Sequence, residues 1–252
     1  MNRRILYALG TLVSLMLACG APSAAAPTAF PLPPTPNFQP LPLATSPASA
    51  PAAQPAAAGF RDDFDGALGA GWQWLGEDPS RWNLTSTPGH LRITTANATI
   101  RDGQPRNFLV RGAPQGNFEI STAVRFTPTS NFQLAGLLVY ASQGNALQFG
   151  QAYAQCSDGA AGQCVYFDNY IGGQIVQPNY GTFAGGASLL YLRLRRTGTT
   201  YTASYSTDGS GWADIGSHQS SIAPAYVGLI SAQGFSGEVP ADFDYFTLTE
   251  MP

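Results

Sequence analysis

Apolar residues alternate with polar residues along most of the chain from residue 59 to residue 252. In the segment 117–126, Phe118, Ile120, Val124 and Phe126 fall on one face of an extended chain. No segment of ten or more residues in this part of the sequence has apolar positions at helical spacing. Because a period of two is the pattern of a strand with one buried face, this part is predicted to be all-β.

Turn chemistry and strand spacing favour two packed sheets. Asp-Gly pairs occur at 65–66, 102–103, 158–159 and 208–209, and this pair tolerates the positive φ angles of tight hairpins. Short strands joined by such turns are typical of a sandwich of two antiparallel sheets. The predicted strands are 90–95, 108–111, 117–126, 132–141, 146–154, 164–171, 190–196, 200–206, 226–232 and 242–249.

The N-terminal segment predicts export. Arg3 and Arg4 precede the uncharged stretch Ile5–Ala18, which is too short to span a bilayer and is typical of a signal peptide. Ala18 and Cys19 match the end of a bacterial lipobox. We therefore expect residues 1–18 to be a lipoprotein signal peptide, with Cys19 lipidated and the chain anchored at the bacterial cell surface. The alternative is ordinary cleavage within 21–26, which would give a secreted protein.

A spacer is expected between the anchor and the folded part. Residues 20–58 contain 11 Pro and 13 Ala and no charged residue. Such a segment cannot bury enough apolar surface to offset the entropy of ordering it. We therefore expect a disordered Pro/Ala-rich tether over 19–58, followed by one domain over 59–252.

Charge and histidine content exclude some classes of partner. The net charge is −3, all 12 basic residues are Arg, and the two histidines, His90 and His218, lie far apart. These numbers argue against an electrostatic nucleic-acid surface and against a His-rich metal site. We expect a monomer that needs no cofactor and contacts a membrane only through its lipid.

Two cysteines remain once Cys19 is assigned to the lipid. Cys156 and Cys164 are separated by seven residues that include Asp158-Gly159. A disulfide across the neck of a hairpin is sterically feasible at this spacing and suits an exported protein. The alternative is a pair of free thiols.

Several separated motifs carry a family resemblance. They are Phe60–Gly66, Gly71–Leu75, Asp78–Leu84, Pro88–Ile93, Asn131–Tyr140, Leu192–Arg196, Tyr205–Gly209 and Ala241–Phe246. Together they resemble the concanavalin A-like β-sandwich at the C-terminus of family 43 β-xylosidases, over nearly all of 59–250. The resemblance implies a jelly roll of two curved antiparallel sheets. In that family a preceding five-bladed propeller performs catalysis. Because this chain has no room for a propeller before residue 59, we expect the accessory domain alone.

Catalytic signals are weak in this sequence. Glycoside hydrolysis generally uses two carboxylates that flank the scissile bond. In jelly rolls of the family 16 glucanase type, these groups come from a Glu-x-Asp-x-x-Glu run, which is absent here. The glutamates are Glu77, Glu119, Glu238 and Glu250. We therefore predict no catalytic residue, and a glycoside hydrolase is kept as an alternative.

Aromatic residues near polar groups suggest sugar binding. Trp72 and Trp74 would point to the same side of an extended segment, next to Glu77 and Arg81. A second candidate surface comprises Tyr140, Phe149, Tyr153, Tyr166 and Tyr170, bordered by the Gly-rich loop 172–187. The residues predicted to bind carbohydrate are Trp72, Trp74, Glu77, Arg81, Tyr153 and Tyr166. The alternative is that the large aromatics belong to the core of the sandwich.

The predicted function is a non-catalytic module that binds a xylan-like polysaccharide. The alternative is a structural or protein-interaction sandwich without a sugar site. A structural calcium ion is a further expectation. Asp62 and Asp65 lie near the first strand and Asp244 lies in the last, and these two strands often pair in sandwiches. The competing explanation for these carboxylates is turn capping.

Overall fold

The structure is a computed structural model that describes residues 59–101, 104–156, 159, 161–233 and 237–252. The predicted signal peptide (1–18), the lipidation site Cys19 and the tether (19–58) lie outside the described residues. Within the described ranges, no helix has the length and apolar character needed to cross a membrane. One short 3₁₀ helix, η1, spans Pro79–Arg81.

The first of two antiparallel sheets, here called sheet A, contains the last strand of the chain. Its strands, from one edge to the other, are β14 (Ala213–Gln219), β13 (Thr200–Ser206), β12 (Leu189–Thr197), β6 (Asn117–Phe126), β16 (Pro240–Met251), β4 (Leu91–Thr94) and β3 (Trp82–Asn83). The first strand, β1 (Phe60–Asp62), pairs antiparallel with β16, as expected for the two ends of the domain.

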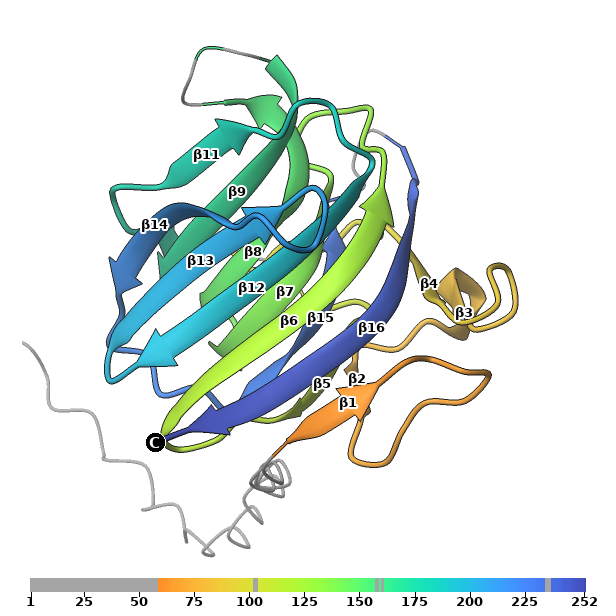
Figure 1. The fold of residues 1–252 in the computed structure, drawn as a ribbon, viewed down its shortest axis with the longest axis horizontal. Helices are drawn as coiled ribbons and strands as arrows, with labels where there is room; N and C mark the ends of the chain where they lie inside the picture. The colour runs from red at the N-terminus through yellow and green to blue at the C-terminus, as the bar shows by residue number, and fades with distance from the viewer. Residues whose placement is uncertain (1–58, 102–103, 157–158, 160, 234–236) are drawn as a thin grey trace, which may run out of the picture. The chain divides into compact units, whose positions relative to one another are not determined.

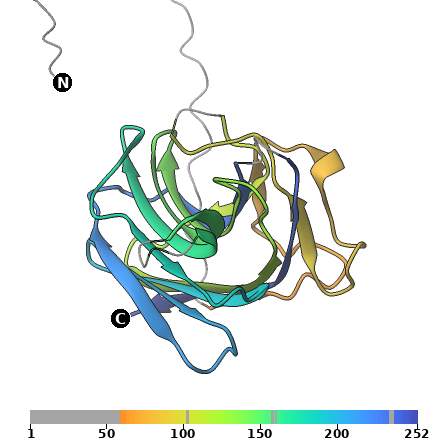
Figure 2. The ribbon, with the colours of Figure 1, turned by 90° about the horizontal axis from the view of Figure 1, so that it is seen from above.

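The second sheet, sheet B, packs against sheet A. Its strands in order are β10 (Gln174–Ile175), β9 (Ala161–Ile171), β8 (Asn145–Gln155), β7 (Leu134–Ser142), β15 (Tyr226–Ala232), β5 (Phe108–Gly112) and β2 (Gln73–Leu75), and β11 (Tyr180–Phe183) also pairs with β9. Figure 1 shows the long strands crossing the molecule, and Figure 2 shows the curved layers from above. The predicted sandwich of two antiparallel sheets is confirmed.

The core lies between the inner faces of the two sheets. In β6 the alternating residues Phe118, Ile120, Val124 and Phe126 are all buried, which confirms the predicted period of two. In β12, Leu190, Leu192 and Leu194 are buried in the same cluster. Because each strand contributes every second residue to this interior, the hydrophobic pattern determines which face of each sheet is turned outward.

The outer face of sheet B carries a second apolar cluster. Ala98 and Ile100, from the segment between β4 and β5, pack there with Phe108, Leu138 and Ile230. This cover explains why β7 and β15, whose sequences contain continuous apolar runs, are buried on both faces. The outer face of β8 and β9 lies beside this cover and forms the candidate site described below.

The predicted disulfide is confirmed. Cys156 follows β8 and Cys164 lies in β9, and the two are bonded with their Cα atoms 5.9 Å apart. Ala152 of β8 is the direct partner of Cys164 in the ladder. The bond therefore closes the connection between the two strands whose outer faces form the candidate site.

Candidate functional site

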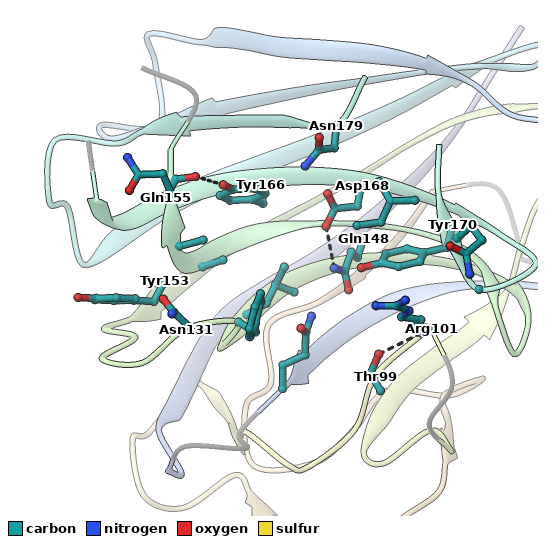
Figure 3. A pocket seen from close by; sticks show the side chains of 18 residues that line it. Thr99, Arg101, Asn131, Gln148, Tyr153, Gln155, Tyr166, Asp168, Tyr170 and Asn179 are labelled. Atoms are coloured by element: carbon teal, nitrogen blue, oxygen red, sulfur yellow. Dashed lines mark hydrogen bonds between the residues drawn. The ribbon is translucent and has the colours of Figure 1, made fainter. Parts of the chain in front are cut away.

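A groove of about 840 Å³ lies on the outer face of sheet B. Its floor comes from β8 and β9, and its borders come from the segments around residues 99–101, 131–132 and 173–179. Figure 3 shows Asp168 and Gln148 near its centre, Tyr153 and Asn131 toward one end, and Arg101 and Thr99 toward the other. The expectation that the loop 172–187 borders a groove is confirmed by Gly173, Gln174, Ile175 and Asn179.

Strand alternation builds the polar centre of the floor. Successive outward positions of β9 are Tyr166, Asp168 and Tyr170, and Asp168 lies directly opposite Gln148 of β8 in the ladder. The Gln148 side-chain Nε2 donates a 2.9 Å hydrogen bond to Asp168 Oδ2. Both side chains are buried, at 2% and 5% exposure respectively. Burial raises the pKa of Asp168 to about 6, although the hydrogen bond from Gln148 acts in the opposite direction.

The neighbouring tyrosines respond to the same buried carboxylate. Burial raises the pKa of Tyr166, and the charge of Asp168 raises it further. The pKa of Tyr170 is raised by the same two causes, while the nearby Arg101 guanidinium acts to lower it. Arg101 therefore lies close enough to Tyr170 to act on it electrostatically.

An exposed aromatic ring borders the groove at Phe132. This side chain is 62% exposed, and its backbone has a φ of 74°, a conformation that bulky residues rarely adopt. The fully buried Gln133 stabilises this turn, because its Oε1 accepts hydrogen bonds from the backbone N–H groups of Thr129 and Ser130. Its Nε2 donates to the carbonyl of Gly237. Strained residues held by their surroundings concentrate at binding sites, so this turn is a positioned element of the groove.

Of the six residues predicted to bind carbohydrate, Tyr153 and Tyr166 line the groove. The Tyr166 hydroxyl donates a hydrogen bond to the carbonyl of Gln155, which holds the ring in place. Phe149, which the sequence argument placed on the same surface, faces the interior and is fully buried, so that assignment was wrong. It neighbours Gln148 in β8, and adjacent residues of a strand point to opposite faces.

The other four predicted residues gather away from this groove. Trp72 is partly buried against the main core, and its Nε1 donates a 2.7 Å hydrogen bond to Asp62. Trp74 also packs against the core, with its ring centroid 4.8 Å from that of Trp82. Trp82 Nε1 in turn donates to Glu77. A sugar-binding role for Trp72, Trp74 and Glu77 stays a prediction. In the structure the two tryptophans pack against the main core, and Glu77 accepts the hydrogen bond from Trp82.

Arg81 belongs to the same region. Its guanidinium forms ion pairs with Asp78 at 3.2 Å and with Glu238 at 2.6 Å. These two carboxylates raise the pKa of Arg81, the contact with Glu238 being the larger cause. A hydrogen bond from Arg81 to a sugar, which its assignment to the carbohydrate site implies, would compete with these protein partners.

The three carboxylates predicted to hold calcium lie in different environments. Asp62 accepts hydrogen bonds from the backbone N–H groups of Phe64 and Gly69 as well as from Trp72. Asp244 lies at an irregularity of the β16 ladder and approaches His90 at 4.0 Å, and Asp65 is exposed. In the described part of the chain, no group of three or more His, Cys, Asp or Glu side chains is placed to hold a metal ion. The calcium ion therefore stays a prediction.

Gln148, Asp168 and Phe132 were not singled out from the sequence. Asp168 had a recognisable signal, because it alternates with Tyr166 and Tyr170, both already assigned to a candidate surface. Gln148 had none, since only the register between β8 and β9 places it opposite Asp168. Among the described residues that line the groove, Asp168 is the only Asp or Glu.

Comparison with solved structures supports the fold. The GH43 BlXynB protein from Bacillus licheniformis is 23% identical with a TM-score of 0.67, over 76% of this chain and 39% of that chain. A xylan β-1,4-xylosidase from Bacillus halodurans is 22% identical with a TM-score of 0.64, over 75% and 39%. A Bacteroides ovatus protein described as xyloglucan PUL GH43B is 23% identical with a TM-score of 0.67, over 79% and 40%.

The present chain spans about two fifths of the length of each of these proteins. No curated protein matches the chain in sequence. A family model does match: the β-xylosidase C-terminal concanavalin A-like domain, over residues 61–249. The chain therefore belongs to the family of concanavalin A-like domains found at the C-terminus of β-xylosidases.

Proposed function

We propose that this domain is a non-catalytic carbohydrate-binding module and that the groove on sheet B is its binding site. The observation that carries the proposal is the combination of an exposed, positioned aromatic ring at Phe132 with a polar floor at Gln148 and Asp168. Pyranose rings have apolar faces and polar edges, so their recognition requires both kinds of group in one concave site.

The family supports a plant-type polysaccharide as the ligand. One of the similar structures is described as a xylan β-1,4-xylosidase, and another is described as xyloglucan PUL GH43B. The family model that matches describes the C-terminal domain of the β-xylosidases. Paired carboxylates are the usual requirement for glycoside hydrolysis, and the described lining of the groove contributes one. Both observations favour binding over bond cleavage.

Affinity electrophoresis in gels containing xylan, arabinan or xyloglucan tests this function. We expect at least one polymer to retard the protein, and F132A to weaken the binding about ten-fold because a ring contact is lost. The matched control is F183A, which removes an exposed phenylalanine that does not line the groove. Folded protein that migrates unretarded through a broad panel of polysaccharides would contradict the proposal.

A protein-interaction module is the second candidate function. Ile171 and Ile175, at the β9–β10 connection, are exposed at 37% and 40%, and Ile175 borders the groove together with Phe132. Exposed apolar side chains of this size also suit a polypeptide partner. This reading is favoured if the protein binds no polysaccharide and instead captures a partner whose binding F132A abolishes.

We further propose that the domain acts at the bacterial surface as a lipid-anchored monomer. The support is the uncharged Ile5–Ala18 stretch that precedes Cys19, and the Pro- and Ala-rich segment that follows it. Metabolic labelling with a radioactive fatty acid checks the anchor, since C19S should then carry no label. Light scattering of the purified protein measures its oligomeric state. Unlabelled wild-type protein in the culture medium would support secretion instead.

A further inference from the structure

The Gln148 side chain has one polar atom that the described protein does not satisfy. Its Nε2 donates to Asp168, whereas its buried Oε1 has no hydrogen-bond partner among the described residues. The side chain is 2% exposed and lines the groove. A buried acceptor without a partner is unfavourable, so it favours a ligand that supplies a donor.

The orientation of this amide follows from its neighbour. An ionised carboxylate only accepts hydrogen bonds, so Asp168 attracts the Gln148 NH₂ group and leaves the amide oxygen on the other side. Figure 3 shows the amide nitrogen facing Asp168 and the oxygen turned away from it. The centre of the floor therefore offers the ligand an acceptor beside a carboxylate.

This pair determines what chemistry fits against the floor. A sugar hydroxyl can donate to Gln148 Oε1, whereas a ligand carboxylate cannot donate and would meet the charge of Asp168. Arg101 is exposed toward one end of the groove, and it is the only cationic side chain among the described lining residues. An acidic sugar attracted by Arg101 is the competing possibility that a test must separate.

We propose that Gln148, oriented by Asp168, is the specificity-determining residue of the groove, and that its amide oxygen accepts a hydroxyl group of a neutral saccharide while a uronic acid at the same position is rejected. This inference rests on the proposed carbohydrate-binding function. Gln148 contacts the ligand, and Asp168 is a positioning residue that acts through it.

Gln151 provides a matched control on the same strand. Its Nε2 donates to the carbonyl of Ala187 at 2.7 Å, and its Oε1 also lacks a described partner. It is fully buried and does not line the groove, because it is an odd number of residues from Gln148 and points to the other face of β8. Q148M and Q151M therefore remove the same group from the same strand, once at the groove and once inside the sandwich.

Calorimetric titration of the full chain with hexasaccharides tests the proposal. The neutral probes are xylohexaose and cellohexaose, and the charged probe is the β-1,4-linked hexamer of glucuronic acid, which differs from cellohexaose at carbon 6. We expect a neutral hexamer to bind at least about ten-fold more tightly than the charged one. Q148M should weaken neutral binding about ten-fold, the usual effect of losing one hydrogen bond, whereas Q151M should leave it unchanged.

The outcomes separate this inference from the function on which it rests. If the glucuronic acid hexamer binds as tightly as the neutral hexamers, or if Q148M and Q151M bind alike, the role of Gln148 is overturned while sugar binding stands. If the folded protein binds none of the hexamers and no polysaccharide, both proposals fail. The comparison of charged and neutral hexamers needs no substitution, so it can overturn the proposal even if Q148M does not fold.

Discussion

Asp168 is a carboxylate held in an unfavourable position. It is 5% exposed, it accepts a hydrogen bond from the neutral amide of Gln148, and burial raises its pKa to about 6. The charge of Asp168 acts on the hydroxyls of Tyr166 and Tyr170, and the Arg101 guanidinium acts on Tyr170. Both tyrosines stay protonated at neutral pH, because the pKa of each is raised above an ordinary value of 10. Buried charges of this kind persist at sites where they orient another group, which is the role proposed here for Gln148.

Replacing Asp168 by Asn should therefore stabilise the protein in a pH-dependent way. The folded-state pKa, about 6, lies above the ordinary value of 3.8, so the folded protein holds the proton more tightly than the unfolded chain. The cost of ionising Asp168 is absent below about pH 4, grows as the pH rises to about 6, and is complete above about pH 7. We expect the free energy of unfolding of D168N, relative to wild type, to increase by about 3 kcal/mol between pH 3 and pH 7.5.

Urea denaturation of both proteins at several pH values measures this difference. D63N is the control, since Asp63 is an exposed aspartate paired with Arg61 on the surface. If the difference in the free energy of unfolding between D168N and wild type stays constant across the pH range, the pKa of Asp168 is not raised in the folded protein.

The tryptophans show the limit of sequence argument at the same scale. Trp72 and Trp74 are close in sequence, but Trp72 packs 4.9 Å from the ring of Phe246 in β16. The residues around Trp72 in the sequence give no sign of this contact, because Phe246 lies about 170 residues further along the chain. Phe132 illustrates the same point, because the neighbouring Gln133 donates a hydrogen bond to the carbonyl of Gly237, about 100 residues further along the chain.

At the scale of elements, the contact between β7 and β8 is unusually close. Gly136 of β7 lies directly opposite Gly150 of β8. A Cβ atom added to Gly150 would collide with the backbone carbonyl of Ala135. The absence of side chains at both positions therefore permits this approach of the two backbones.

Replacing Gly150 by Ala should disrupt this pairing. Neither backbone can move without disturbing the ladder, so we expect G150A to lower the free energy of unfolding by about 3 kcal/mol. Thermal or urea denaturation measures the loss. G116A is the matched control, because a Cβ at Gly116 meets nothing within 4 Å and should change stability by less than about 0.5 kcal/mol. Equal stability of the two variants would contradict the close approach.

The long strands inside the sheets were predictable from the sequence, whereas most of the shortest strands were not. β6 and β12 carry a full alternation, and both were predicted nearly to their ends. The alternation does not predict β1, β2, β3, β10 or β11, which have two to four residues each. It also misses β14, an edge strand whose residues are mostly exposed or half-buried, because an exposed strand has no apolar face to reveal it.

At the scale of the whole molecule, the disulfide and the two apolar clusters hold the domain together. The bond joins the end of β8 to β9, beside the groove. Both cysteines are buried, at 3% exposure for Cys156 and 0% for Cys164. In the chain-entropy model, closing this short loop restricts the unfolded chain and thereby stabilises the folded domain.

Removing the disulfide should lower the global stability. For C156A/C164A we expect a loss of about 2–3 kcal/mol in the free energy of unfolding, the value for a loop of this length. Wild-type protein in a strong reductant should unfold at the same urea concentration as the double variant, and this comparison separates the covalent bond from the side-chain change. If oxidised and reduced wild type unfold together, the bond does not contribute to stability.

The class of fold and the family follow from the sequence alone, and the sequence also predicted the disulfide while leaving a pair of free thiols as the alternative. Hydrophobic alternation, turn residues and cysteine spacing are local properties of the chain, and the family motifs are read in the same way. The position of the candidate site follows instead from tertiary contacts. The groove depends on the register that sets Gln148 opposite Asp168, on the segment that covers part of sheet B, and on the contact between Gln133 and Gly237 beside Phe132. These contacts join residues far apart in the chain, and their energies depend on neighbours that no local pattern specifies.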